Sequence, residues 1–420
     1  MRWVATEEVG RVEPDAGEVL GRLIDASHHV SPSALPAFVA AHAAGLGAHE
    51  AVLYLVSYEQ RYLQPLAGDG VPDREPLDID ATIGGRAYRT TTPVDAEGAG
   101  GKLNRLWVPL VDGTTRLGVL ELSFDVVDDG RRQAARRLAG VVAELIVSRN
   151  FYGDSFPRAR RRAEMTLAAE MQWTLLPPQT FTDRRITVAG VLEPAYSIAG
   201  DSFDYAYNDD TLSFAIIDAM GHGFEAMLLA SVAVGAYRHS RRAGRGLAET
   251  YASMDEVLSA HFGPDQFVTG QLGELDASTG ALRWLNAGHP APLLVRGGRV
   301  IGLLECAPTF PIGFGGAIAE IAEYRLQPED HLLFYTDGVI EARSPEGEFF
   351  GDERLSDLLG RAITAELPAA ETMRRLSHAI LAHQRGQLQD DATTLLITWH
   401  GRTPVEPRSI ERDVSETSDG

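Results

Sequence analysis

The second half of the chain alternates short apolar runs with turn residues. Residues 212–217 form a nearly continuous apolar run that stops at Asp218, where a glycine-flanked turn begins. Residues 331–335 and 392–399 are two further apolar runs that lie next to acids. Apolar runs of this length, bounded by turn signals, are typical of buried strands. The pattern therefore predicts strands that place carboxylates at their ends.

Hairpins and helices are predicted around these strands. Turn residues separate paired apolar runs, which predicts hairpins of residues 271–276 with 281–285 and of residues 293–296 with 300–303. Apolar residues at helical spacing predict helices over residues 224–242, 247–262 and 372–385. Residues 181–400 are therefore expected to form an α-β-β-α sandwich, with two antiparallel sheets inside and helices outside.

The first part of the chain has its own pattern of helices and strands. Residues 34–44 and 132–148 are expected to be helices, and residues 51–58 a strand. Residues 107–111 and 117–124 flank Asp112-Gly113, which predicts a hairpin. Residues 17–150 are thus expected to form a domain with an antiparallel sheet covered by helices, and the whole chain falls in the α+β class. The ends, residues 1–16 and 401–420, are expected to be a flexible N-terminus and a disordered tail.

Residues 151–180 are expected to be a helical linker between the two domains. A helix is predicted within residues 163–176, because Pro177 and Pro178 end it. Leu167, Met171 and Leu175 form an apolar stripe along this helix. The stripe needs a partner, which is a second copy of the chain in a homodimer, the C-terminal domain, or each of these in different states.

Composition excludes several classes of function. The 420 residues include 38 Lys and Arg against 59 Asp and Glu, a net charge of −21, which argues against nucleic acid and anionic membranes as main partners. The single cysteine, Cys306, excludes an internal disulfide or a cysteine-based zinc site. The chain has no apolar run of about 18 residues and no secretory leader, so a soluble, cytoplasmic protein is expected.

Acidic residues recur beside the predicted strands. Asp201 follows a predicted strand over residues 188–198, Asp218 and Asp337 follow two others, and Asp390-Asp391 precedes the last. Two carboxylates about 4 Å apart repel each other by about 4 kcal/mol at an effective dielectric of about 20. Since a fold has a stability of only roughly 5 to 15 kcal/mol, cations are needed to keep gathered acids ionised. The donors are hard oxygens, so Mg²⁺ or Mn²⁺ is favoured over Zn²⁺.

Five motifs occur in an order that resembles the metal-dependent type 2C protein phosphatases. They are Gly200-Asp201-Ser202-Phe203-Asp204, Asp218-Ala219-Met220-Gly221-His222-Gly223, Asn286-Ala287-Gly288-His289-Pro290, Tyr335-Thr336-Asp337-Gly338 and Asp390-Asp391-Ala392-Thr393. The resemblance spans about residues 186–399 and narrows to the bacterial branch that includes SpoIIE and RsbU. It implies a protein serine/threonine phosphatase that uses two Mn²⁺ or Mg²⁺ ions.

The resemblance also implies roles for individual residues. Catalytic metal ligands are implied at Asp201, Asp218, Asp337 and Asp390, with Asp218 bridging the ions and the carbonyl of Ala219 as a lesser ligand. Adjacent side chains point apart in an extended chain, so Asp391 is the reserve for Asp390. The implied substrate is a phosphoserine or phosphothreonine on an anti-sigma-factor antagonist, carried by a separate chain.

Two histidines and Asp204 are assigned less directly. Eukaryotic members of the resembled family carry a histidine as general acid where this chain has Met220, so His222 is either catalytic or turn-stabilising. His289 is expected to be structural, because Gly-His-Pro is a tight-turn composition. Asp204 is expected to be structural or to lie just behind the metal ligands.

Residues 17–150 resemble a GAF domain, a small-ligand sensor module. The resemblance rests on the order of elements, including a helix start at residues 82–88, the hairpin and the final helix. It implies a small-molecule ligand, and the alternative is a fold that serves only dimerisation or scaffolding. Two other interpretations of the chain are a catalytically silent ligand-sensing scaffold and a structural Ca²⁺ site at the acids.

Overall fold

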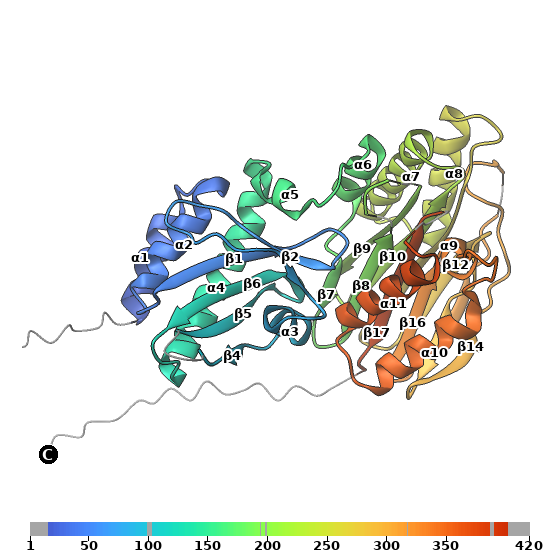
Figure 1. Ribbon diagram of the computed structural model, residues 1–420. Helices are drawn as coiled ribbons and strands as arrows, with labels where there is room; N and C mark the ends of the chain where they lie inside the picture. The colour runs from blue at the N-terminus through green and yellow to red at the C-terminus, as the bar shows by residue number, and fades with distance from the viewer. Residues whose placement is uncertain are drawn as a thin grey trace, which may run out of the picture.

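The computed structural model describes residues 16–98, 103–193, 195–197, 200–316, 318–386 and 390–401. Its strands form three antiparallel sheets, one in the N-terminal part and two in the C-terminal part (Figure 1). Residues 1–15 and 402–420, which make up nearly all of the two predicted flexible ends, lie outside the described residues.

The N-terminal sheet has six strands in the order β3-β2-β1-β6-β5-β4. Their bounds are Leu77–Asp78 (β3), Tyr62–Pro65 (β2), Glu50–Val56 (β1), Thr115–Phe124 (β6), Asn104–Asp112 (β5) and Val94–Ala96 (β4). Strands β5 and β6 are joined by a tight turn between Asp112 and Thr115, which confirms the predicted hairpin.

Helices cover both faces of this sheet. On one face lie α1 (Ala16–Ser27), α2 (Leu35–Ala44) and α4 (Asp129–Arg149), whose apolar side chains share a core with alternate residues of β1 and β6. On the other face lies α3 (Ile83–Thr90), where Ala87 and Tyr88 share a smaller core with Tyr54 and Trp107. Because side chains alternate between the two faces of a strand, β1 contributes Leu53 and Leu55 to the first core and Val52 and Tyr54 to the second.

The C-terminal part is a sandwich of two sheets. One sheet has the order β15-β12-β11-β10-β9, with bounds Ala322–Arg325, Ala281–Ala287, Val268–Asp276, Thr211–Ala219 and Asp201–Asn208. The other has the order β14-β13-β16-β17-β8-β7, with bounds Arg299–Leu303, Leu293–Arg296, Asp330–Tyr335, Ala392–Trp399, Ile186–Glu193 and Thr180–Thr182. Their inner faces meet in one core, in which the rings of Phe214 and Phe334 lie 4.8 Å apart.

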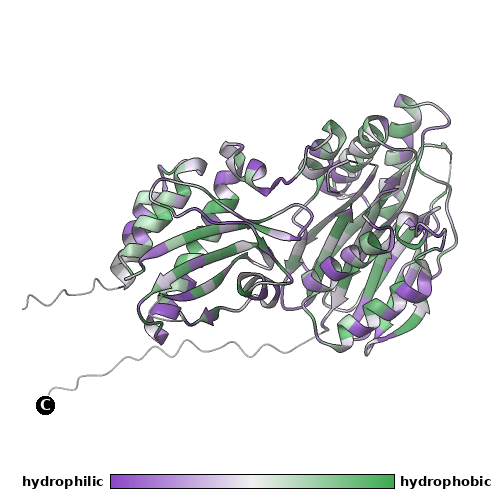
Figure 2. Cartoon of the chain, viewed as in Figure 1, coloured by the Kyte–Doolittle hydropathy of each residue, from purple (hydrophilic) through white to green (hydrophobic). Residues whose placement is uncertain are grey.

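Helices lie on the outer faces of the sandwich, as predicted. The first sheet is covered by α7 (Phe224–Arg242) and α8 (Leu247–His261). The second is covered by α9 (Asp337–Ile340), α10 (Gly351–Thr364) and α11 (Ala369–His383). Figure 2 shows apolar residues concentrated along the strands, while the helices mix apolar and polar residues. No helix within the described part of the chain is long and apolar enough to cross a membrane.

Two sequence-based expectations about elements were wrong or incomplete. The strand expected over residues 188–198 ends at Glu193, and Asp201 begins β9 instead of following a strand. Pairing with β10 explains this, because Asp201 lies opposite Asp218 in an antiparallel register that starts at this residue. Helix α10 was not predicted, although Leu355 and Leu359, one turn apart, are buried.

The linker contains a short helix, α5 (Ser155–Arg160), and the helix α6 (Leu167–Leu175). Helix α6 packs on α7 and buries Ala168, Ala169 and Gln172. Met171 and Leu175 are partly buried and pack against the core that Ala168 shares with α7 and α8, whereas Leu167 is 65% exposed. The buried side of α6 is therefore rotated away from the predicted stripe. Of the partners considered for this helix, the structure shows the C-terminal sandwich.

Buried charges join the N-terminal part to α11. Glu371 on α11 accepts a hydrogen bond from Arg116 of β6 at 3.1 Å and from Arg374 at 2.9 Å. Arg374 is only 1% exposed and also donates to Asp80, which precedes α3. These arginines lower the pKa of Glu371, although burial opposes its ionisation. Helix α11 thus connects the N-terminal part to β8 and β17, on which it packs.

Glu193, at the end of β8, is a buried carboxyl group whose ionisation is expected to destabilise the fold. Burial, with a smaller effect of the Glu59 charge, raises its pKa from 4.5 to about 8. The folded state therefore holds this proton more tightly than the unfolded state, and stability falls as the pH rises toward 8. A group with these pKa values loses about 2 kcal/mol of stability between about pH 6 and pH 8.

We expect Glu193→Gln to remove this part of the pH dependence. Urea denaturation at several pH values in that window measures the free energy of unfolding, and the difference between wild type and variant isolates the contribution of Glu193. Glu353→Gln, at an exposed position on α10, is the matched control and should follow the wild-type curve. Parallel curves for Glu193→Gln and wild type would contradict the expectation.

Candidate functional site

The predicted acids lie at one edge of the sandwich. Asp201 begins β9 and faces Asp218 near the end of β10 in the first sheet. In the second sheet β16 ends at Tyr335, opposite Thr394 of β17, so Asp337 follows one strand and Asp390-Asp391 precedes its neighbour. Antiparallel pairing brings the end of one strand beside the start of the next. Both sheets therefore present carboxylates at the same edge.

Hydrogen bonds tie the acids of the two sheets together. The Thr336 hydroxyl donates to Asp201 Oδ2 at 2.7 Å, and the backbone N–H of Thr393 donates to the Thr336 oxygen at 3.0 Å. The backbone N–H of Asp201 donates to Asp391 Oδ2 at 3.1 Å. Thr336 is fully buried, so it positions Asp201 across the two sheets. The sequence pattern did not assign a role to Thr336. Its position directly before Asp337 was the signal that could have indicated one.

The site concentrates negative charge in a poorly solvated place. Burial raises the pKa of Asp218 to about 7, with added repulsion from Asp337 and Asp390. Burial and then the charges of Asp390 and Asp218 raise the pKa of Asp391 to about 7. The pKa of Asp201 is also raised, by burial and then by Asp218 and Asp391. The acids are therefore close enough to oppose one another's ionisation.

The donor set fits a hard divalent cation. Asp391 is buried, and its Oδ1 has no hydrogen-bond partner among the described residues. A buried carboxylate oxygen without a partner is costly unless a cation or a proton satisfies it. Asp337 and Asp390 are exposed, and in the described part of the chain no three acidic, histidine or cysteine side chains converge closely enough to hold an ion as they lie. This edge of the sandwich is thus a candidate metal centre. Its candidate ligands are neighbours, but their side chains do not converge on a single position.

Ala219 and Gly200 shape the backbone beside the acids. The N–H of Ala219 donates to the Gly200 carbonyl at 3.2 Å. A side chain at residue 200 would place its Cβ 3.2 Å from the Ala219 carbonyl oxygen and 3.4 Å from the Cβ of Ala226. Glycine at this position therefore allows the two backbone segments to approach closely.

The remaining candidates have different surroundings. His222 is exposed near Asp390, and Met220 beside it is half exposed. His289 is buried, which lowers its pKa to about 3, and its Nδ1 lies 3.1 Å from Thr269 Oγ1. The Asn286 side chain accepts a hydrogen bond from the His289 N–H and donates one to the His289 carbonyl. These two hydrogen bonds stabilise the turn that contains His289.

Asp204 is a structural residue in this fold. It forms ion pairs with Arg238 and Arg241 of α7, each at 2.8 Å, and Arg238 also donates to the Leu175 carbonyl at the end of α6. Asp204 is buried, so these two arginines compensate its charge. It anchors α7 and the end of α6 to β9.

Comparison with known families adds an independent finding. Residues 208–400 match the family model of Stage II sporulation protein E, SpoIIE. These residues form a SpoIIE-family domain. The matched range includes Asp218, Asp337, Asp390 and Asp391, and it begins after Asp201.

The similarity to individual proteins extends over a longer part of this chain than the match to the SpoIIE family model. Protein IcfG of Synechocystis sp. is 27% identical over 267 residues, which are 57% of this chain and 42% of IcfG. Phosphoserine phosphatase RsbU of Bacillus subtilis is 22% identical over 242 residues, which are 56% of this chain and 70% of RsbU. The crystal structure of the RsbU and RsbW domains of Rv1364c from Mycobacterium tuberculosis aligns with 52% of this chain and 63% of that chain, at 29% identity and a TM-score of 0.44. The chain spans less than half the length of IcfG.

Gln172 connects the linker helix α6 to the acids beside the SpoIIE-family domain. Its side-chain nitrogen donates to the Asp201 carbonyl oxygen at 2.8 Å, and the residue is fully buried. The sequence pattern does not single it out, because a glutamine among apolar helix positions carries no motif. Its position next to the apolar stripe of α6 was the available signal.

We expect Gln172→Met to weaken the site more than the fold. Methionine fills a similar volume but cannot donate, so the Asp201 carbonyl loses its partner, and loss of such supporting contacts typically lowers metal affinity or activity roughly 10- to 100-fold. Metal-dependent phosphate release and the metal concentration for half-maximal activity measure the effect. Gln64→Met on β2 is the matched control. Equal activity in both variants would show that α6 does not support Asp201.

Proposed function

We propose that this protein is a metal-dependent serine/threonine protein phosphatase. The observation that carries the proposal is the edge of the sandwich where Asp201, Asp218, Asp337 and Asp390-Asp391 lie together, next to and within a SpoIIE-family domain. The phosphoserine phosphatase named among the relatives of this chain supports the same chemistry.

We assign the metal-binding roles to the residues at this edge. Asp218 has Asp201 as its neighbour in the first sheet and Asp337 and Asp390 as neighbours from the second. It would be shared by two Mn²⁺ or Mg²⁺ ions. Asp201, Asp337, Asp390 and the Ala219 carbonyl would complete the set, with Asp391 as the alternative to Asp390. Bound cations supply Lewis acidity and activate water for attack on a phosphomonoester. The chain itself holds Asp201 through Thr336 and Gln172 and keeps Asp391 away from solvent.

The substrate and its regulation extend the proposal. The substrate would be a phosphoserine or phosphothreonine on an anti-sigma-factor antagonist, and the net charge of −21 favours a neutral or basic docking surface on it. Residues 17–150 would be a GAF-like sensor, residues 151–180 a switch, and residues 181–400 the phosphatase domain. A homodimer through α6 remains a prediction that involves the exposed Leu167.

Mn²⁺-dependent hydrolysis of p-nitrophenyl phosphate by the full chain is the first test. Activity that a chelator removes and Mn²⁺ restores is expected, followed by release of phosphate from a phosphorylated antagonist protein. Melting temperature is measured in the same samples. Stabilisation by Mn²⁺ or Ca²⁺ without hydrolysis of either substrate would contradict the proposal and favour a structural metal site or a silent scaffold.

A further inference from the structure

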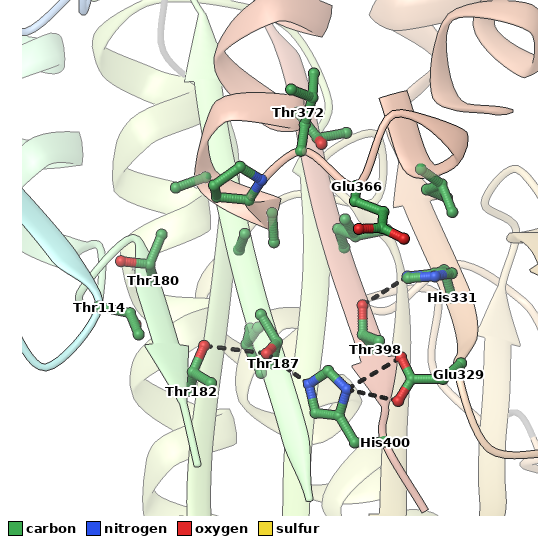
Figure 3. A pocket seen from close by; sticks show the side chains of 18 of the residues that line it. Thr114, Thr180, Thr182, Thr187, Glu329, His331, Glu366, Thr372, Thr398 and His400 are labelled. Atoms are coloured by element: carbon green, nitrogen blue, oxygen red, sulfur yellow. Dashed lines mark hydrogen bonds and ion pairs between the residues drawn. The ribbon is translucent and has the colours of Figure 1, made fainter. Parts of the chain in front are cut away.

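A cavity of about 730 Å³ lies between the N-terminal part and the second sheet of the sandwich. Its floor is the outer face of β8, β17 and β16, and its walls are the β5–β6 turn and the connection from α10 to α11 (Figure 3). Thr187 of β8 pairs with Thr398 of β17, which pairs with His331 of β16. The acids lie at the opposite ends of these strands, so the cavity is separate from the candidate metal centre.

Most polar groups on the floor are already satisfied by one another. His400 Nε2 lies 2.9 Å from Thr187 Oγ1, and its Nδ1 lies 3.1 Å from a Glu329 oxygen. His331 Nδ1 lies 2.8 Å from Thr398 Oγ1, and burial lowers the pKa of His331, which keeps it neutral. These contacts leave an ordered floor of threonine and histidine side chains, as Figure 3 shows.

Some charged side chains that line the cavity have ionic partners and others do not. Arg116 is committed to Glu371 at 3.1 Å and to the Ala370 carbonyl at 3.0 Å, and it stacks on the Tyr88 ring. Glu366, on the connection from α10 to α11, forms no ion pair with any described residue. Among the described lining residues, Glu366 therefore has no ionic partner and Glu329 has only His400, whereas the one arginine, Arg116, is paired. An anionic ligand would meet repulsion here, whereas a hydrogen-bond donor would find an acceptor.

Apolar side chains supply the rest of the lining. Ala189 and Leu396 contribute from the outer face of the sheet, and Ile363 at the end of α10 and Leu367 on the connection that follows contribute from above it. Cavities of about 300 to 1,000 Å³ with mostly apolar walls and a few polar groups are typical of small-molecule sites. We propose that this cavity binds an uncharged, largely apolar small molecule that donates hydrogen bonds. The ligand contacts both the N-terminal part and the sandwich, beside the Arg116–Glu371 pair, and the site does not depend on the proposed phosphatase activity.

Two fluorescent probes that differ by one charged group test the ligand class. N-phenyl-1-naphthylamine is uncharged and carries one N–H donor, and 8-anilinonaphthalene-1-sulfonate has the same ring skeleton with an added sulfonate. Titration of the full chain is expected to give saturable binding of about one equivalent of the uncharged probe, with at least about tenfold weaker binding of the sulfonate. Absence of saturable binding of the uncharged probe, or equal affinity for both, would overturn the proposal.

Variants locate the binding site. Thr187→Trp fills the floor and is expected to remove binding of the uncharged probe, while Thr211→Trp, on a strand of the other sheet, leaves it unchanged. Glu366→Lys, at an exposed position, is expected to reverse the charge preference and strengthen sulfonate binding. Leu367→Trp fills the cavity from the other wall and replaces Thr187→Trp if that variant fails to fold. Unchanged binding in a folded Thr187→Trp or Leu367→Trp variant, or an unchanged charge preference in Glu366→Lys, would place the probe elsewhere and overturn the proposal.

Discussion

Asp218→Asn is expected to reduce Mn²⁺-dependent phosphate release by roughly 10³-fold, the largest effect of any single substitution considered for this protein. Asp218 has acidic neighbours from both sheets, since Asp337 and Asp390 oppose its ionisation and Asp201 faces it across the ladder. Asparagine keeps the shape but removes the charge that cations require. The rate of hydrolysis and the affinity for Mn²⁺, measured by calorimetry, should both fall.

The same substitution should stabilise the protein when no divalent cation is present. Removing one carboxylate relieves repulsion at the crowded edge, so the melting temperature in chelator is expected to rise by a few degrees. Asp209→Asn, in the exposed turn at the other end of the same hairpin, is the matched control and should change neither quantity. Full activity in Asp218→Asn would refute the assignment of this edge as the catalytic centre.

Glu371→Gln is expected to destabilise the junction between the two parts of the chain by about 3 to 5 kcal/mol. The substitution leaves Arg116 and Arg374 buried without their shared carboxylate, and both arginine side chains are almost inaccessible, at 3% and 1% exposed. Removal of one partner from a buried ion pair is costly because the other charge stays out of water. Urea denaturation measures the loss, and limited proteolysis reports whether the linker becomes accessible first.

Glu348→Gln is the control for the junction prediction. Glu348 pairs with Arg354 on the surface, where the side chains are 69% and 50% exposed, and such pairs contribute about 0 to 1 kcal/mol. A loss in Glu371→Gln no larger than in Glu348→Gln would mean that solvent reaches the junction. In that case the N-terminal part would not be held against α11 by these charges.

Local patterns in the sequence accounted for several of the strands and helices. The hairpin at Asp112-Gly113, the strand ending at Asp218 and the helix over residues 224–242 follow from periodicity and turn chemistry, which involve only near neighbours in the chain. The same patterns predicted the α-β-β-α arrangement and drew attention to Asp201, Asp218 and Asp337. Each of these inferences depends on residues a few positions apart.

Tertiary structure decided which residues meet. Pairing of β9 with β10 placed Asp201 at the start of a strand opposite Asp218, and packing of α6 on α7 turned Gln172 inward and Leu167 outward. The Thr336–Asp201 bond and the Arg116–Glu371 pair join residues 135 and 255 positions apart. The sequence by itself therefore determined most of the elements and the acids they carry. Contacts across the two sheets and between the two parts of the chain depend on how whole surfaces fit together, which no local pattern encodes.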